Sequence, residues 1–231
     1  MVDQRKKKRR KSTTQISRRD FLKFTGTVAI GAGVLPRLIW LDDAIAGIPA
    51  SEGYLLVDTK KCQGCLSCML ACSLVHEGKE NLSLARIQVL QNSFGKFPDD
   101  LTVAQCRQCV EPPCVEACPE KALYVDTKDG NIRRVDIKKC IGCKSCVQAC
   151  PYEPGRALWN PGQKHALKCD LCSDAPFWNE KGGVKGKQAC VEVCPLSAIK
   201  FTKEIPIQKG DSGYKVNLRG ESWKKLGYPM D

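Results

Sequence analysis

The sequence predicts an α+β fold of small tandem β-α-β units with insertions and an extended C-terminal tail. The chain of 231 residues contains 16 cysteines but only 6% aromatic residues, so metal or covalent links are expected to replace part of a hydrophobic core. Residues 57–68 (VDTKKCQGCLSC) return as residues 135–146 (VDIKKCIGCKSC), and nine of the twelve positions are identical. Residues 114–119 (CVEACP) likewise return as residues 190–195 (CVEVCP). An internal repeat of this kind indicates a repeated structural unit.

Each unit is expected to run from a strand through a cysteine loop and a short helix carrying the last cysteine to a second strand. Strands over residues 54–58 and 133–137 lead into cysteine loops, and strands over residues 122–126 and 198–202 follow the helices. Asp129 and Gly130 predict a hairpin turn between residues 123–127 and 132–137. A proline after the last cysteine ends three of the short helices, whereas Ser73 takes that place in the first.

Three further stretches lie outside the repeated unit. Residues 74–104 form an insertion in which Leu84, Ile87 and Val89 predict one strand. Residues 173–189 are rich in glycine and lysine and are expected to form a loop. Residues 203–231 show no clear periodicity, so we expect an extended tail that lies on the domain at residues 47–202 or on a partner.

Residues 1–46 have the features of a twin-arginine signal peptide. Residues 5–11 are basic, and residues 17–23 (SRRDFLK) match the twin-arginine motif through Arg18 and Arg19. A weakly apolar stretch follows, and a small-residue site predicts cleavage after Ala46. A transmembrane anchor is the alternative, but Pro36 and Arg37 interrupt the run before the ~20 apolar residues that a span needs. Since this route exports folded proteins, the predicted location is periplasmic, with cofactors inserted before export.

The net charge of +12 comes largely from this leader. Residues 1–46 contain eleven Lys and Arg against four Asp and Glu, which leaves +5 for the rest of the chain. A basic leader that is removed is no evidence for nucleic-acid binding. We therefore expect no nucleic-acid partner.

The cysteines form four motifs, each with four members. The first and third motifs have the spacing C-x2-C-x2-C-x3-C, which is that of bacterial two-cluster ferredoxins. Three cysteines on a tight loop can each reach one iron, and Gly64 and Gly142 permit the turn. The fourth cysteine ligates a second cluster, so the motifs must pair. The second and fourth motifs keep the C-x2-C opening and the C-x3-C ending but have a longer gap between the second and third cysteines. The sequence thus predicts four [4Fe–4S] clusters with no cysteine left over.

Other uses of cysteine fit this pattern less well. Structural zinc prefers two separated C-x2-C pairs and has no role for a third cysteine two residues further on. Cysteines repeatedly three residues apart are poor disulfide partners. A [3Fe–4S] centre arises where a ligand is missing, and none of the four motifs lacks one.

Two histidines and one lysine are candidates for additional site residues. We interpret His76 and His165 as surface or hydrogen-bonding residues rather than ligands. Lys168 lies beside Cys169 and could tune a cluster potential, but a solvated lysine is the favoured interpretation.

Four aromatic residues are also candidates for a role. Tyr152 and Trp159 follow the third motif, where they either flank its cluster or pack in an ordinary way. Trp178 and Trp223 are candidate anchors on a partner surface, because aromatic residues are enriched at interfaces.

Four motifs in this order, with the long gap in the fourth, resemble the four-cluster electron-transfer subunits of molybdopterin oxidoreductases. That family includes the iron–sulfur subunits of dimethyl sulfoxide, polysulfide, thiosulfate, tetrathionate and formate-linked enzymes, and ferredoxin-like subunits of some hydrogenases. The resemblance covers residues 52–202 and rests on all sixteen cysteines. Residues 73–78 (SLVHEG) and 82–87 (LSLARI) also resemble the small iron–sulfur subunits of tungsten or molybdenum aldehyde oxidoreductases.

The family resemblance implies that the first motif pairs with the fourth and the second with the third. The implied first set is Cys62, Cys65, Cys68 and Cys194, and the second set is Cys169, Cys172, Cys190 and Cys72. The third set is Cys106, Cys109, Cys114 and Cys150, and the fourth set is Cys140, Cys143, Cys146 and Cys118. In such subunits the first cluster faces the catalytic subunit and the fourth faces a membrane partner.

The expected function is electron transfer without catalysis, because the sequence has no paired carboxylates, nucleophile–base dyad or nucleotide loop. The implied partners are a molybdopterin or tungstopterin catalytic subunit and a quinone-linked membrane-anchor or cytochrome subunit. No carboxy-terminal membrane helix is visible, so any membrane contact is expected through that separate subunit. A hydrogenase-associated subunit, a free periplasmic polyferredoxin and a zinc-stapled interaction module are the alternatives.

Overall fold

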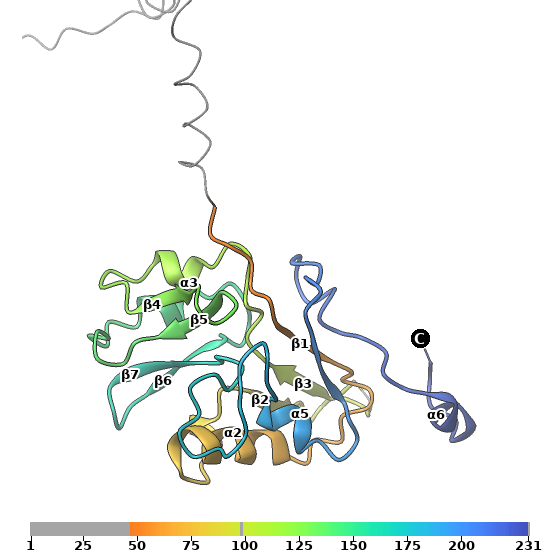
Figure 1. The fold of residues 1–231 in the computed structure, drawn as a ribbon. Coiled ribbons are helices and arrows are strands. Elements are labelled where there is room, and N and C mark those ends of the chain that lie inside the picture. The colour runs from red at the N-terminus through yellow and green to blue at the C-terminus, as the bar shows by residue number, and fades with distance from the viewer. Residues whose placement is uncertain (1–46, 98, 231) are drawn as a thin grey trace, which may run out of the picture. The chain divides into compact units, whose positions relative to one another are not determined.

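The computed structural model describes residues 47–97 and 99–230 (Figure 1), so the predicted signal peptide lies outside the described residues. The described chain forms four separate two-stranded antiparallel sheets joined by short helices and loops. This combination of small sheets and few helices is consistent with a ferredoxin-like 4Fe–4S domain.

Two of the sheets carry the predicted repeat. Strand β1 (Tyr54–Val57) pairs with β8 (Ile199–Thr202), the last strand of the chain. Strand β4 (Leu123–Asp126) pairs with β5 (Ile132–Val135). Gly130 and Asn131 turn between β4 and β5 with φ angles of 61° and 57°. The four predicted strands and the hairpin are confirmed, with ends that differ by one or two residues.

The other two sheets are hairpins that the sequence predicts incompletely. Strand β2 (Gln88–Gln91) pairs with β3 (Leu101–Ala104), so the insertion contains two strands rather than the one expected. Strand β6 (Ala157–Asn160) pairs with β7 (His165–Lys168), and the sequence pattern predicts neither strand.

The helices differ from the prediction in which cysteine they carry. Helices α3 (Pro113–Glu116), α4 (Ser145–Gln148) and α5 (Ala189–Glu192) each contain the third cysteine of a motif and end two residues before the last one. A residue before proline is disfavoured in the α region, which keeps Cys118, Cys150 and Cys194 outside their helices. Helix α2 (Ser67–Glu77) has Ser73 in place of that proline, so it continues past Cys72 to Glu77. A single 3₁₀ turn, η3 (Leu82–Leu84), follows α2.

The C-terminal tail is not wholly extended, which corrects the prediction. It carries a short helix, α6 (Glu221–Lys225), and Lys215 forms a parallel bridge with Val57. The rings of Trp223 and Phe97 both lie edge-on to Tyr228, so the tail contacts the hairpin β2–β3. The described residues 173–188 contain no helix or strand, as expected for a loop. Among the described helices, none has the length and apolar character needed to cross a bilayer.

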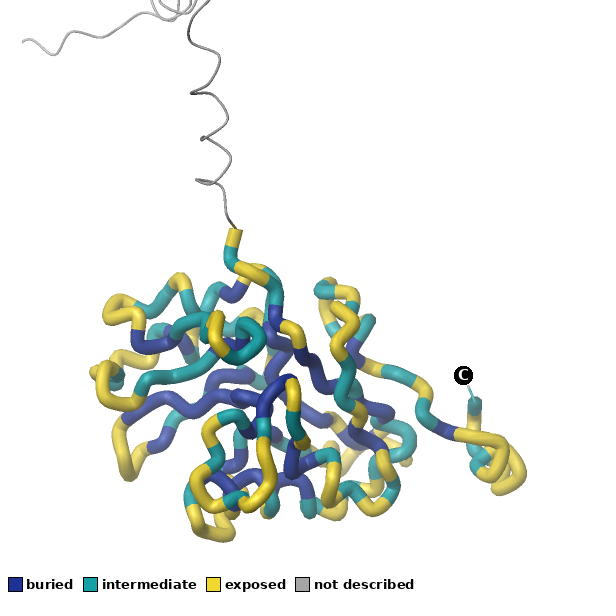
Figure 2. Tube along the Cα trace, viewed as in Figure 1, coloured by how far each residue is buried: buried dark blue, intermediate teal, exposed yellow. Residues whose placement is uncertain are grey.

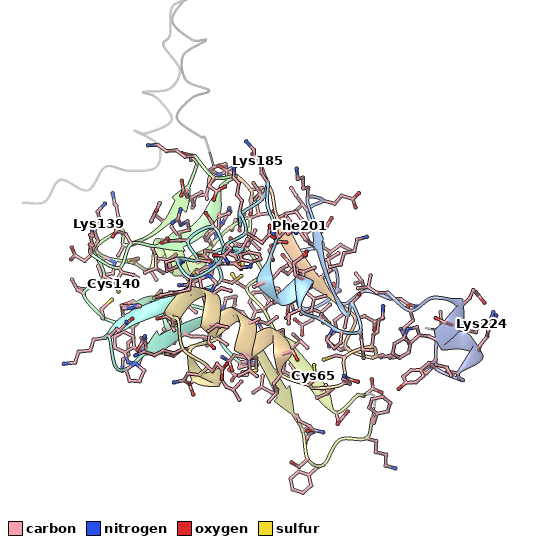
Figure 3. The ribbon with its side chains drawn as sticks, turned by 60° about the horizontal axis from the view of Figure 1, so that its bottom comes forward. Cys65, Lys139, Cys140, Lys185, Phe201 and Lys224 are labelled. Atoms are coloured by element: carbon pink, nitrogen blue, oxygen red, sulfur yellow. The ribbon has the colours of Figure 1, made fainter. Side chains whose placement is uncertain are left out.

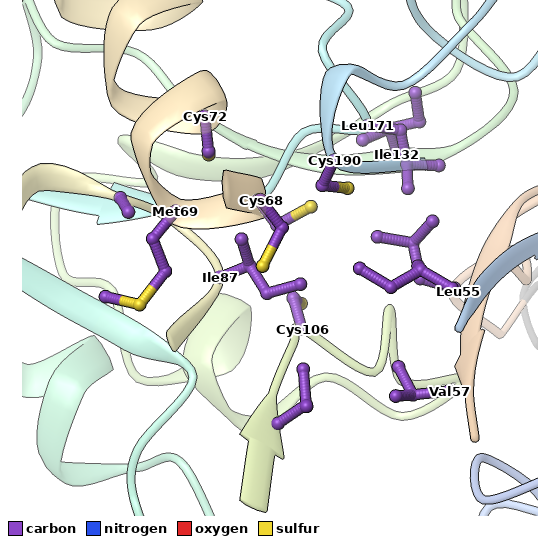
Figure 4. Packing of buried hydrophobic residues seen from close by; sticks show 14 of the residues in the cluster. Leu55, Val57, Cys68, Met69, Cys72, Ile87, Cys106, Ile132, Leu171 and Cys190 are labelled. Carbon is purple, nitrogen blue, oxygen red and sulfur yellow. The ribbon is translucent and has the colours of Figure 1, made fainter. Parts of the chain in front are cut away.

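The core is shared between aliphatic residues and cysteines. Buried chain runs through the middle of the described unit in Figure 2, and the largest cluster of buried residues joins Leu55, Ile87, Ile132 and Leu171 to cysteine side chains. Figure 4 shows Cys68, Cys72 and Cys190 among these aliphatic side chains. Folding and the formation of the cysteine sites therefore depend on the same packing.

Candidate metal centres

None of the sixteen cysteines forms a disulfide, and the structure gathers them around four cavities. Among the described residues, no group of three or more His, Cys, Asp or Glu side chains is arranged to hold a single metal ion. Instead, four thiols line each of four enclosed spaces. Thiolate sulfur is the ligand type that selects iron–sulfur clusters and soft metals.

The first set lines a small cavity with almost entirely apolar walls. Cys62 and Cys65 lie on the loop before α2, Cys68 lies in its first turn, and Cys194 reaches the cavity from beyond α5. The second set lines a small cavity together with Leu55, Ile87 and His76. Both cavities take a cysteine from α2, Cys68 in the first and Cys72 in the second.

The third set lines a small cavity beside Tyr152, and the fourth set lines another beside Trp159. In every case the structure brings together the four cysteines that the family resemblance groups. Their role as cluster ligands stays a prediction. Trp159 flanks the cavity of the third motif's first three cysteines, which is one of its two predicted placements, whereas Tyr152 flanks the neighbouring cavity.

The same backbone turn occurs two residues after the first cysteine of every motif. Gly64 and Gly142 have φ angles of 70° and 75°, and Gln108 and Leu171 have φ angles of 46° and 55° at the equivalent positions. A positive φ is ordinary for glycine but strained for other residues. The glycine signal in the sequence therefore marks two of these turns and misses the other two.

The last cysteine of each motif accepts a backbone N–H. The donors to Cys72, Cys118, Cys150 and Cys194 are the amides of Arg86, Leu123, Arg156 and Ala198, at 3.2, 3.4, 3.1 and 3.2 Å from Sγ. Hydrogen bonds to sulfur stabilise the thiolate form and tune cluster potentials. Sequence reasoning misses these four contacts, because their donors lie on loops and strand starts without a sequence signature.

The thiols differ in acidity according to their burial. Burial raises the pKa of the Cys68, Cys114 and Cys172 thiols to about 12. At Cys143, hydrogen bonds with Ser145 lower the thiol pKa. Since a metal ligand must be a thiolate, the buried thiols would lose their protons only as a cation balances the charge. The donor type, the grouping and the enclosed space all fit iron–sulfur clusters.

A buried polar network supports the second set. Asp170 accepts hydrogen bonds from Arg86 Nη1 at 2.7 Å and interacts with His76 Nε2 at 3.0 Å. Burial opposes ionisation, but Arg86 and His76 outweigh it and hold the pKa of Asp170 well below its usual range. His76 is thus a buried hydrogen-bonding residue, and His165 is another, with Nε2 at 2.7 Å from Gln163 Oε1.

Lys168 contradicts the expectation of a solvated lysine. It is only 5% exposed, and its Nζ donates to Cys106 Sγ at 2.7 Å. Burial lowers the pKa of Lys168, but the negative charge of Cys106 and Cys114 outweighs that effect and raises it overall. The buried contact joins residues that are 62 positions apart, which no local pattern reveals.

The candidate partner anchors lie at different places. Trp178 packs against a small buried cluster around Val75 and Ala189. Trp223 is half-buried in the tail beside Tyr228. Neither contact tests a role in partner binding.

Comparisons with known proteins agree with the cysteine chemistry. Residues 99–204 match a family model described as a 4Fe–4S dicluster domain. A Protein NrfC homolog of Haemophilus influenzae is 34% identical, and the match covers 81% of this chain and 80% of the relative. The thiosulfate reductase electron transfer subunit PhsB of Salmonella typhi is 36% identical, with 69% and 81% covered. A subunit of the tetrathionate reductase of Salmonella typhimurium is 31% identical, with 77% and 70% covered.

Proposed function

The chain belongs to the 4Fe–4S dicluster family of electron-transfer iron–sulfur proteins, and from this premise we propose that its sixteen cysteines hold four [4Fe–4S] clusters that connect two partner proteins. The observation that carries the proposal is the gathering of four cysteines from two motifs at each of four cavities. Each cluster, when bound, supplies one-electron chemistry whose potential the surrounding protein tunes.

The four sets differ in exposure in a way that supports a relay. Cys65 of the first set and Cys143 of the fourth set are exposed, whereas all four cysteines of the second set are buried. Cys65 and Cys140 lie well apart in Figure 3. The first and fourth sets would exchange electrons with partners, and the second and third sets would connect them.

The strand pairing supports two ferredoxin-like units, one nested inside the other. The pairing of β1 with β8 brings the first motif next to the fourth, and the pairing of β4 with β5 brings the second next to the third. Each unit would provide two cluster sites, and the tail at residues 203–231 would complete a docking surface.

The proposed partner at the first set is a molybdopterin or tungstopterin catalytic subunit, and the chain itself would not be catalytic. Two relatives are named as subunits of thiosulfate and tetrathionate reductases, which supports a reductase complex. The partner at the fourth set would be a membrane-anchor or cytochrome subunit. Arg18 and Arg19 support export in folded form to the periplasm.

Anaerobic purification from periplasmic and membrane fractions, with iron counted per chain, tests this function. About sixteen iron atoms and reduced-state EPR spectra of coupled [4Fe–4S] clusters are expected, together with a co-purifying molybdenum or tungsten subunit. Zinc or disulfides in place of iron would refute the cluster assignment. Co-purification of a nickel–iron subunit would refute the proposed molybdenum or tungsten partner. Changing Arg18 and Arg19 to lysine should leave the protein in the cytoplasm.

The pairing of motifs needs its own test. Cys62→Ala and Cys194→Ala remove cysteines that are far apart in the sequence but line the same cavity. Both variants should lose the same EPR signal, while Cys118→Ala should lose a different one. Loss of different signals in Cys62→Ala and Cys194→Ala would contradict the pairing.

A further inference from the structure

Four buried cationic side chains line the cavity of the third set. They come from four separate segments and are between 0 and 5% exposed: Arg107, Arg133, Arg156 and Lys168. Lys168 makes the most direct contact, because its Nζ donates to Cys106 Sγ at 2.7 Å. Buried charges are usually paired, so a group of four like charges in one place needs an explanation.

The arginines have hydrogen-bonding capacity that the protein leaves unused. Nε and Nη1 of Arg107, Nε of Arg133 and Nε of Arg156 are buried without a hydrogen-bond partner. Within the described residues, the ion pairs of these four cations comprise only Arg107 with Asp211, whose carboxylate side chain is 42% exposed. The protein therefore neutralises little of this positive charge with its own carboxylates.

The aromatic rings beside the cavity keep the cations in place. The Arg107 guanidinium lies over the Tyr214 ring at 4.2 Å and over the Tyr152 ring at 5.7 Å. The Arg156 guanidinium also lies 5.7 Å from the Tyr152 ring. Contacts of this kind hold a cation without cancelling its charge.

The other three cavities have no comparable charge. The first has no charged side chain in its lining. Glu120 and Lys144 line the fourth, but both are exposed and oppositely charged. At the second, Asp170 pairs with Arg86 and His76, and Glu77 also lies 3.8 Å from Arg86, so two carboxylates balance the two cations. Excess buried positive charge is thus specific to the third set.

We propose that the four buried cations make the third set the first of the four sites to be reduced, and that Lys168 sets its reduction potential. The inference deepens the proposed function and rests on it. Reduction adds one electron, supplied by a neighbouring iron–sulfur site or by a chemical reductant, and makes the site one unit more negative without uptake of a proton. Fixed positive charge nearby stabilises that reduced form, and screening is weak in the interior. The third set would therefore store the electron within the relay.

Potentiometric EPR titration of the iron-loaded protein tests the role of Lys168. Lys168→Met removes the charge at nearly constant volume, and Lys168→Gln also removes the charge but keeps an N–H donor for Cys106. In both variants, the ratio of reduced to oxidised form for the first signal should fall at least tenfold at a fixed potential, which is a shift of about 59 mV to lower potential. Lys168→Arg keeps the positive charge, so the first signal should stay close to its wild-type potential. Lys185→Met is the matched control at an exposed lysine that lines none of the four cavities, and it should leave the first signal unchanged.

The outcomes separate this inference from the proposed function. An unshifted first signal in Lys168→Met that still holds about sixteen irons would overturn the inference while the electron-transfer function stands. A shift in Lys168→Met but not in Lys168→Gln would also overturn it, because the hydrogen bond rather than the charge would set the potential. If Lys168→Met fails to load iron, Arg156→Met provides the test. This substitution removes another of the four cations but retains the backbone N–H that donates to Cys150. That variant should shift the same signal downward, and an unchanged signal would refute the proposal.

Discussion

Asp58→Asn should release the C-terminal tail from the loop that carries the first cysteines. The Asp58 carboxylate is buried and holds two segments together. Its Oδ1 accepts the backbone N–H groups of Lys60 and Lys61 at 3.1 and 3.2 Å. Its Oδ2 accepts the backbone N–H of Leu218 at 2.8 Å and Nε of Arg219 at 3.1 Å.

The size of the effect follows from burial. The side chains of Asp58 and Arg219 are 2% and 3% exposed, so water screens the pair little. Asparagine keeps the shape of the side chain but removes the charge that faces the Arg219 guanidinium. Breaking a buried pair in this way costs about 3–5 kcal/mol, which corresponds to an increase of roughly 150- to 4,000-fold in the opening equilibrium of the tail.

Hydrogen exchange of the iron-loaded protein, read by mass spectrometry over residues 214–219, measures this opening. The matched control is Glu180→Gln, which breaks an ion pair with Lys187 at 3.4 Å whose side chains are 53% and 51% exposed. An exposed pair contributes about 0–1 kcal/mol, so exchange near Glu180 should rise by less than about fivefold. Exchange in the tail of Asp58→Asn within fivefold of the wild type would refute the reasoning.

Two further substitutions test the packing around the second set. Gly182→Ala should abolish iron loading of that set, because the added Cβ would lie 1.8 Å from the carbonyl oxygen of Cys172, whereas Gly220→Ala meets nothing within 4 Å and should load iron normally. Asp170→Asn should destabilise the same region by about 3–5 kcal/mol, because it removes the carboxylate that lies 2.7 Å from the buried Arg86 guanidinium and leaves only Glu77, at 3.8 Å. Faster loss of visible cluster absorbance in denaturant would show this, and an unchanged rate would contradict it.

The features predicted correctly from the sequence are those with a local cause. The strands beside the cysteine motifs are short stretches rich in β-branched and aromatic residues, and the turn at Gly130 follows from a two-residue pattern. The four-fold repetition of the motifs predicts four sites because the ligand spacing is set within a few residues of each loop. The helix ends were predicted wrongly although their cause is also local: each helix ends before Cys118, Cys150 or Cys194, because the proline that follows disfavours the α region at that cysteine.

The features missed have causes far away in the sequence. Strand β7 contains His165 and Lys168, and every residue of the strand is buried, so the alternation that marks a half-buried strand is absent. Lys168 is buried because it meets a thiol 62 residues upstream. Helix α6 is only five residues long and has no buried residue, so it carries little amphipathic signal.

The turns after the first cysteines show why the two longer motifs are harder to recognise. At Gly142 a Cβ would lie 2.8 Å from the carbonyl oxygen of Lys164, so this turn requires glycine for space as well as for conformation. At Gln108 the same turn carries a buried side chain, which donates to the carbonyl of Cys169 at 2.8 Å and accepts the N–H of Arg133 at 2.9 Å.

A left-handed conformation costs a residue other than glycine roughly 1–2 kcal/mol, and each net hydrogen bond contributes about 0.5–1.5 kcal/mol. The two contacts of Gln108 are therefore sufficient to offset its strain. The backbone N–H of Gln108 donates to Cys106 Sγ at 3.3 Å, so this residue connects Cys106 of the third set to Cys169 of the second set. A glycine at this position would ease the turn but lose that connection, so the departure from the glycine pattern is itself part of what holds neighbouring sites in register.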